Sequence, residues 1–491
     1  MSVVRRQGIK NTVYTYLGIT LGVLSTLYIQ PFFLTQEQIG ITRLVISVAT
    51  ILASLSCLGI TGVIIKFFPL FNDSEKKHNG FFTIALTFPV FGFLLCFGVV
   101  TLFEKSIISF YGVNGAILQE YFWPIVLTGL FNCLIFSFTA YCNAIQKSSL
   151  PTLINEVLNR IGFIVCILCF FYGVTTQNEY IYSLSLIFLI QLVLLFFIIA
   201  KFDHPKISPA FFSNNKHLPE IIRFGLIAAF IQITGISLKF IDVLFVGKYE
   251  KIDQVGIYSI ASFIGLVLET PLLAIEKIAG AKIARLFADG NLSEINKIYR
   301  LSSKYLMVFC GLLGCMLVAC IEPTLALLPG DYSSGTWVSI IICVGAFFNS
   351  ATGVNYSILT YSNQYKLGAL FYVCLLTLAC ILNIWLIPIY GIMGAAIATA
   401  STSVLHNILR FMLIKVKLNM QPFTTDSVKI IFIILISLFS VYFITLENKI
   451  ALIALRGSLS ALIFIILLVI FKVFTIKELK EEFISLKKTF F

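Results

Sequence analysis

Charged side chains inside long apolar runs are the residues of this sequence best suited to chemistry. Lys239 lies deep in the apolar run 221–247, and Asp242 follows one helical turn later. A charge at the centre of a bilayer costs about 2.5–3.5 kcal/mol on insertion scales, so such residues pair, face a cavity or bind a ligand. Lys239 therefore either forms a structural ion pair with Asp242 or attracts an anionic group. Gln232, seven residues earlier, is expected on the same helix face.

Further polar residues in apolar runs are candidates for lining a cavity. Glu269 lies near the middle of the run 255–279, and Asn155 and Asn159 share one face of a helix because they are four residues apart. Interhelical hydrogen bonding is the alternative role for the amides. The candidate substrate-binding residues are Lys239, Asp242, Gln232, Glu269, Asn132, Asn155, Asn159 and Asn355. Arg43, near the start of the second run, is expected to extend toward the membrane surface.

The sequence gives no sign of an enzyme. Its four histidines have no metal-ligand spacing, and most of its 12 cysteines lie inside apolar runs, where packing is the simpler role. No phosphate-binding P-loop is present, which argues against an ATPase. We therefore predict no catalytic residue, no metal and no cofactor, and a transporter as the class of protein.

The composition predicts an all-α integral membrane protein. Of the residues, 59% are hydrophobic and 12% charged, and mean hydropathy is +0.97, whereas about a quarter of a soluble domain is charged. Runs of about 20 apolar residues, enough to cross a bilayer, predict about 14 transmembrane helices at 12–33, 40–66, 80–103, 118–142, 153–174, 180–200, 221–247, 255–279, 303–328, 336–361, 367–388, 392–414, 428–446 and 452–474.

The net charge of +12 follows from membrane topology. With the N-terminus inside, 28 of the 35 Lys and Arg residues fall on the inner side and six on the outer side, Lys239 being the remaining one. This bias obeys the positive-inside rule and predicts cytoplasmic N- and C-termini. The basic excess would contact anionic lipids of the inner leaflet, so no nucleic acid partner is needed.

The second half of the chain repeats the first at low identity. At an offset of 216 residues, the difference between positions 40 and 256, Gln38-Ile-Gly40-Ile41 aligns with Gln254-Val-Gly256-Ile257 and Lys66 with Lys282. A repeat at this spacing predicts two structural halves. The polar, proline-containing segment near 201–220 is the expected linker between them.

Several segments together resemble Wzx-type polysaccharide flippases of the multidrug/oligosaccharidyl-lipid/polysaccharide exporter superfamily. They are Ile241-Asp242, Val246-Gly247, Val255-Gly256-Ile257-Tyr258-Ser259, Lys282-Ile-Ala-Arg285 and Ile389-Tyr390-Gly391-Ile392-Met393-Gly394-Ala395-Ala396. The resemblance implies two pseudo-symmetric six-helix lobes as in MATE transporters, with two accessory helices. The expected domains are the N-terminal lobe 1–200, linker 201–220, C-terminal lobe 221–417, accessory helices 418–474 and a cytoplasmic amphipathic tail 475–491.

The resemblance also implies a function. A flippase of this family moves undecaprenyl-diphosphate-linked oligosaccharide repeat units across the bacterial inner membrane by alternating access, for O-antigen, lipopolysaccharide or other surface polysaccharide. Lys239 would then meet the diphosphate, and a polysaccharide polymerase and other assembly proteins are expected partners. The run Val13–Phe33 has no charged side chain, which argues against lipid II as the cargo.

Two other functions stay open. One is a cation-coupled multidrug or small-molecule exporter of the same fold, for which Glu269 would be the coupling residue. The other is a membrane-embedded polysaccharide polymerase or glycosyltransferase. Such an enzyme would require a large external loop or paired acidic residues that face outward.

Overall fold

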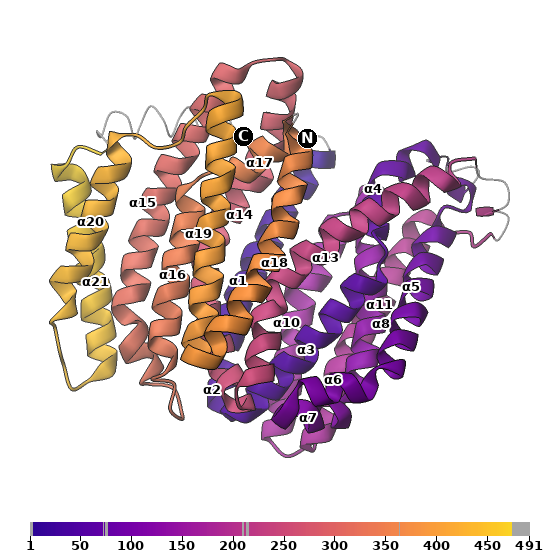
Figure 1. Cartoon of the computed structure of the whole chain (residues 1–491), viewed down its shortest axis with the longest axis horizontal. Helices are drawn as coiled ribbons and strands as arrows, with labels where there is room; N and C mark the ends of the chain where they lie inside the picture. Colours follow the sequence, from indigo (N-terminus) through magenta and orange to yellow (C-terminus); the bar gives the residue numbers. More distant parts are fainter. Residues whose placement is uncertain are drawn as a thin grey trace. The chain divides into compact units, whose positions relative to one another are not determined.

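The protein is built from long apolar helices in this computed structural model (Figure 1). The structure describes residues 3–71, 73, 77–208, 211–212, 216–362 and 364–473, and these contain helices and no strand. Thirteen described helices are long and apolar enough to cross a membrane, or 14 if the bent pair α16 (Gly335–Ala351) and α17 (Asn355–Tyr361) is one span. The predicted all-α membrane fold is therefore confirmed. The expected amphipathic tail, 475–491, lies outside the described residues.

The chain forms two compact units that meet at Ser259 and Ile260, inside α14 (Ile252–Ala288). Unit 1 includes α13 (Leu218–Tyr249), because this helix packs against α3 (Gln36–Ser56) and α4 (Ile60–Phe71). The compact units thus divide later in the sequence than the linker predicted at 201–220. The lobe boundaries given above stay a prediction.

In unit 1, α8 (Phe122–Ala144) has α3, α4, α5 (Phe82–Leu102) and α11 (Gln177–Asp203) as neighbours. The core on these helices is aromatic and aliphatic, with Phe67, Phe82 and Tyr141 almost fully buried. The remaining elements of unit 1 are α1 (Val3–Val23), η1 (Leu24–Ile29), α2 (Gln30–Phe33), η2 (Lys77–Gly80), α6 (Glu104–Phe110), η3 (Gly112–Asn114), α7 (Gly115–Glu120), α9 (Ser149–Thr152), η4 (Leu153–Leu158) and α10 (Asn159–Phe171).

Three expected spans of unit 1 are not continuous α-helices. The run 40–66 is divided into α3 and α4 at Leu58 and Gly59, which have φ angles of 46° and 71°. Two other runs contain the π-helical segments η1 and η4. Irregular turns of this kind often mark functional sites in helices.

The sequence repeat has a direct structural counterpart at the starts of α3 and α14. A Cβ atom added to Gly40 would meet the backbone of Ile252, and one added to Gly256 would meet the backbone of Gln36. Gln36 and Ile252 are themselves equivalent at the offset of 216 residues. The two repeats therefore touch reciprocally at equivalent residues, and the absence of side chains lets the backbones approach.

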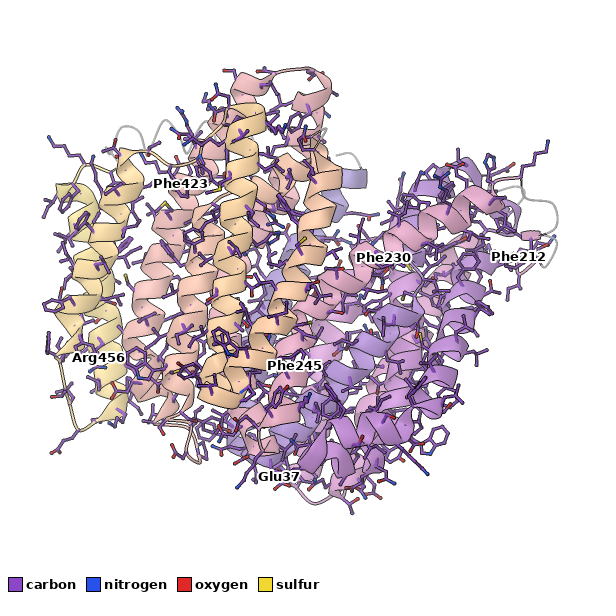
Figure 2. All side chains as sticks on the ribbon, viewed as in Figure 1. Glu37, Phe212, Phe230, Phe245, Phe423 and Arg456 are labelled. Carbon is purple, nitrogen blue, oxygen red and sulfur yellow. The ribbon has the colours of Figure 1, made fainter. Side chains whose placement is uncertain are left out.

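Unit 2 contains a bundle and a C-terminal hairpin. Its elements after α14 are α15 (Leu292–Leu325), α16, α17, α18 (Tyr365–Tyr390), α19 (Ile392–Leu418), α20 (Thr425–Tyr442) and α21 (Lys449–Ile470). The hairpin α20–α21 packs against α15. Arg456 of α21 (Figure 2) donates to the carbonyl oxygens of Ile444 and Tyr442 at 3.0 and 3.3 Å and forms a salt bridge with Glu322 of α15 at 3.3 Å.

Candidate functional site

Unit 1 contains a cavity of about 490 Å³ lined by side-chain amides, which we name the amide pocket. It brings together four residues that the sequence singled out, on α8, η4, α10 and α13. Among the described residues that line it, none has an ionisable side chain. The polar lining residues are Thr61, Asn132, Thr139, Asn143, Asn155, Asn159, Gln191 and Gln232, and the apolar ones are Ile65, Ile135, Phe136, Ala140, Phe188 and Ile236.

Hydrogen bonds between the lining residues hold the amides of this pocket in place. Asn159 Nδ2 donates to Gln191 Oε1 at 2.7 Å, and Gln191 Nε2 donates to Asn155 Oδ1 at 2.6 Å. Asn155 Nδ2 continues the chain to Thr139 Oγ1 at 3.2 Å. On α4 and α13, the Thr61 hydroxyl donates to Gln232 Oε1 at 2.7 Å. The pocket therefore presents an ordered, uncharged set of donors and acceptors.

The segment formed by η4 and α10 has a second face, directed toward α1. A Cβ added to Gly18 would lie 2.7 Å from the Cβ of Glu156, and one added to Gly22 would lie 3.3 Å from the guanidinium of Arg160. Gly18 and Gly22 form a G-x-x-x-G pattern, which permits close helix packing in membranes. Asn155 and Asn159 thus line the pocket, while the next residues, Glu156 and Arg160, lie against α1.

Arg43 is a second cation in the membrane-spanning part of unit 1. It lies about two turns inside α3 and is half-buried. Its guanidinium donates to Gln30 Oε1 at 3.1 Å and to Thr26 Oγ1 at 3.3 Å. These two hydrogen bonds connect Arg43 of α3 to side chains of η1 and α2. The positive charge of Arg160 also interacts electrostatically with the Arg43 guanidinium. Glu156, one helical turn before Arg160, is a carboxylate whose charge acts on Arg160.

Lys239 and Asp242 lie on α13 outside the amide pocket. Lys239 is exposed, whereas Asp242 is buried and accepts a hydrogen bond from Tyr258 Oη at 3.1 Å. The role of Lys239 in ligand binding stays a prediction.

Glu269 and Asn355 belong to a separate polar network in unit 2. Asn349 Nδ2 donates to Glu269 Oε1 at 3.0 Å, and Asn407 Nδ2 donates to Asn349 Oδ1 at 3.0 Å. Asn355 Nδ2 donates to Asn407 Oδ1 and to Thr352 Oγ1, each at 2.9 Å. The network therefore links one carboxylate to three amides on α14, α16, α17 and α19.

Sequence reasoning missed several members of the amide pocket. Gln191 is the most informative, because it is buried and bonds to both Asn155 and Asn159. It is the one polar residue in the strongly apolar stretch 186–199, and that isolation is a usable signal. Thr61 and Asn143 carry no such signal, because hydroxyl and amide groups near helix ends are common.

Comparison with known proteins assigns the family. The model of the family described as polysaccharide biosynthesis protein matches residues 8–276, which include every residue of the amide pocket. The chain belongs to this family. No curated protein sequence matches the chain.

Solved structures of membrane proteins share its fold. A structure described as the lipid II flippase MurJ in an inward closed conformation matches with a TM-score of 0.77 at 16% identity, covering 94% of this chain and 99% of that one. An inward-facing multidrug resistance MATE transporter of the MOP superfamily matches with a TM-score of 0.60 at 13% identity, covering 85% and 98%. A MOP superfamily transporter from Pyrococcus furiosus matches with a TM-score of 0.54 at 11% identity, covering 84% and 95%. The chain is thus a multi-pass membrane protein with this fold.

Proposed function

We propose that this protein is a flippase that moves a lipid-linked oligosaccharide, carried on undecaprenyl diphosphate, across the bacterial inner membrane by alternating access. It would act in the synthesis of a cell-surface polysaccharide such as O-antigen, as a transporter and not as an enzyme. The Lys and Arg distribution supports cytoplasmic N- and C-termini and contact with anionic inner-leaflet lipids. A polysaccharide polymerase and other assembly proteins are the partners proposed with it.

The arginine pair of unit 1 is the observation that carries the proposal. Arg43 and Arg160 lie in membrane-spanning helices with Glu156 as the neighbouring carboxylate, which leaves an excess of positive charge. Arginine presents a planar fork of donors that suits phosphate oxygens. A positively charged site favours a diphosphate and disfavours cationic drugs.

A test in the source cell separates this function from its alternatives. We expect deletion of the gene to cause repeat units linked to the lipid carrier to accumulate on the cytoplasmic face, with loss of surface polysaccharide. Complementation with Arg43→Met should fail and with Arg43→Lys should succeed in part, because Lys keeps the charge without the fork. The Lys239→Met variant is the matched comparison at the cation that the sequence favoured. If Lys239→Met fails and Arg43→Met complements, the diphosphate site is at Lys239.

The Glu269 network favours a second candidate, a cation-coupled exporter. A half-buried carboxylate that accepts from Asn349 could exchange a proton or bind a metal cation during transport. In that case the deletion strain would keep normal surface polysaccharide and become sensitive to cationic compounds. Glu269→Gln would reproduce the same sensitivity.

A further inference from the structure

We infer that the amide pocket is a saccharide subsite that takes one uncharged sugar residue of the cargo. The inference rests on the proposed function, because it assigns the sugar part of the lipid-linked oligosaccharide to a defined place in unit 1. It extends that function by stating which sugars the site accepts: neutral and N-acetylated pyranoses, in preference to uronic acids and amino sugars.

The absence of charge in the lining gives this selectivity. Eight lining residues are hydroxyl or amide residues, and the described lining has no carboxylate, ammonium, guanidinium or imidazole group. A carboxylate or ammonium group that leaves water for such a site gains no opposite charge there. A neutral hydroxyl or acetamido group exchanges its hydrogen bonds with water for hydrogen bonds with the amides.

The internal hydrogen bonds leave specific edges of the amides for a ligand. Because Gln232 Oε1 accepts from Thr61, the Nε2 group of Gln232 is left as a donor. Because Asn159 Nδ2 donates to Gln191, the Oδ1 atom of Asn159 is left as an acceptor. A sugar hydroxyl both donates and accepts, so it suits donor and acceptor edges placed around one cavity.

The other walls suit the apolar face of a pyranose ring. Phe136 and Phe188 line the pocket together with aliphatic side chains of α4, α8 and α13. Carbon-bound hydrogens on one face of a pyranose can pack on an aromatic ring while the hydroxyls reach the amides. The volume, about 490 Å³, lies in the range of about 300–1,000 Å³ usual for small-molecule sites.

The position of the pocket relative to the arginine pair supports a sugar and not an unrelated metabolite. Asn159, which lines the pocket, is followed in the chain by Arg160, which lies against α1. A lipid-linked oligosaccharide has its first sugar directly attached to the diphosphate. Adjacent faces of one helical segment, η4 and α10, therefore match adjacent parts of one ligand. The π-helical geometry of η4 at this point is typical of functional sites.

The test measures binding of small glycosides to the full chain in lipid nanodiscs. Saturation-transfer NMR would compare the methyl β-glycosides of glucose, N-acetylglucosamine, glucuronic acid and glucosamine. We expect the first two to bind, and the charged pair to bind at least about tenfold more weakly, because an unmatched charge outweighs one hydrogen bond. Sodium chloride is a second probe, since amide and hydroxyl oxygens could also hold a cation.

Three variants and a control make the result specific to the pocket. Gln191→Leu removes the centre of the network, and Asn143→Leu changes an exposed lining residue with no side-chain hydrogen bond among the described residues. Both should lower the affinity for the neutral glycosides by about tenfold. Asn159→Asp adds a carboxylate and should raise the affinity for the glucosamine glycoside by at least about tenfold. Gln421→Leu, an exposed amide in unit 2, should leave binding unchanged.

The outcomes separate this inference from the proposed function. Equal binding of charged and neutral glycosides, no binding of any glycoside, or sodium binding that depends on Gln191 would each overturn the subsite. If that happens while the deletion strain still accumulates lipid-linked oligosaccharide, the flippase function stands without it. If the neutral glycosides bind as expected but the deletion strain exports polysaccharide normally, the pocket is a sugar site and the proposed function fails.

Discussion

Replacing Gly256 with alanine should destabilise the protein through the crossing of α3 and α14. The added Cβ would lie 3.0 Å from the carbonyl carbon of Gln36 and 3.2 Å from the amide nitrogen of Gly40. Carbon atoms pack at about 3.5–4.0 Å, so the two backbones must separate. Overpacking costs about 1–3 kcal/mol, and the upper end applies because the obstacle is backbone and not a flexible side chain.

Gly235→Ala in α13 is the matched control, because a Cβ there meets nothing within 4 Å. Both substitutions gain about 0.5–1 kcal/mol of helix propensity. That gain cancels in the comparison, so the gap between the two variants should be about 3 kcal/mol, the overpacking cost alone. Denaturation in mixed micelles, followed by circular dichroism, measures it. Equal stability of the two variants would refute close packing at this crossing. Gly40→Ala should lower the stability as Gly256→Ala does.

Further substitutions test other contacts, by denaturation, hydrogen exchange or proteolysis. Asn114→Ala should lower the free energy of unfolding by about 1–3 kcal/mol, because Asn114 Nδ2 donates to the carbonyl oxygens of Gly247 and Glu250 at 2.8 and 2.7 Å. Unchanged hydrogen exchange at the end of α13 would contradict this. Thr35→Ala should cost about 1 kcal/mol by removing the capping box of α3, and Thr35→Ser should restore it. Arg456→Met should loosen the hairpin α20–α21 and speed proteolysis between 443 and 448; a cleavage rate like that of the unchanged protein would show that Arg456 does not hold the hairpin.

The sequence predicted the fold well because the signals involved are additive along the chain. The hydropathy of a span needs no knowledge of tertiary contacts. The break between α3 and α4 escaped this reasoning, because Cys57-Leu58-Gly59 is apolar enough to be averaged into one span. Only the backbone conformation of Leu58 and Gly59 reveals it.

The candidate site was predicted in part. The residues that were missed make contacts between helices that are far apart in the sequence. Spacing placed Asn155 and Asn159 on one face, and both line the amide pocket. Their partner Gln191 comes from another helix, so no local pattern connects the three. The partners of Arg43 were not predicted for the same reason, because Thr26 and Gln30 lie on other elements that fold beside α3. Asp242 likewise bonds to Tyr258 of α14, which spacing along α13 could not indicate.

The reciprocal glycine contact has the form of an isologous interface, the kind that joins two identical subunits around a two-fold axis. Residue 40 meets residue 252, and residue 256 meets residue 36, as each subunit of a homodimer offers the other the same patch. A half-length ancestor could have made this contact between two separate chains. Fusion of the genes would then have turned an association that depends on protein concentration into one that does not, and freed each half to acquire different polar residues.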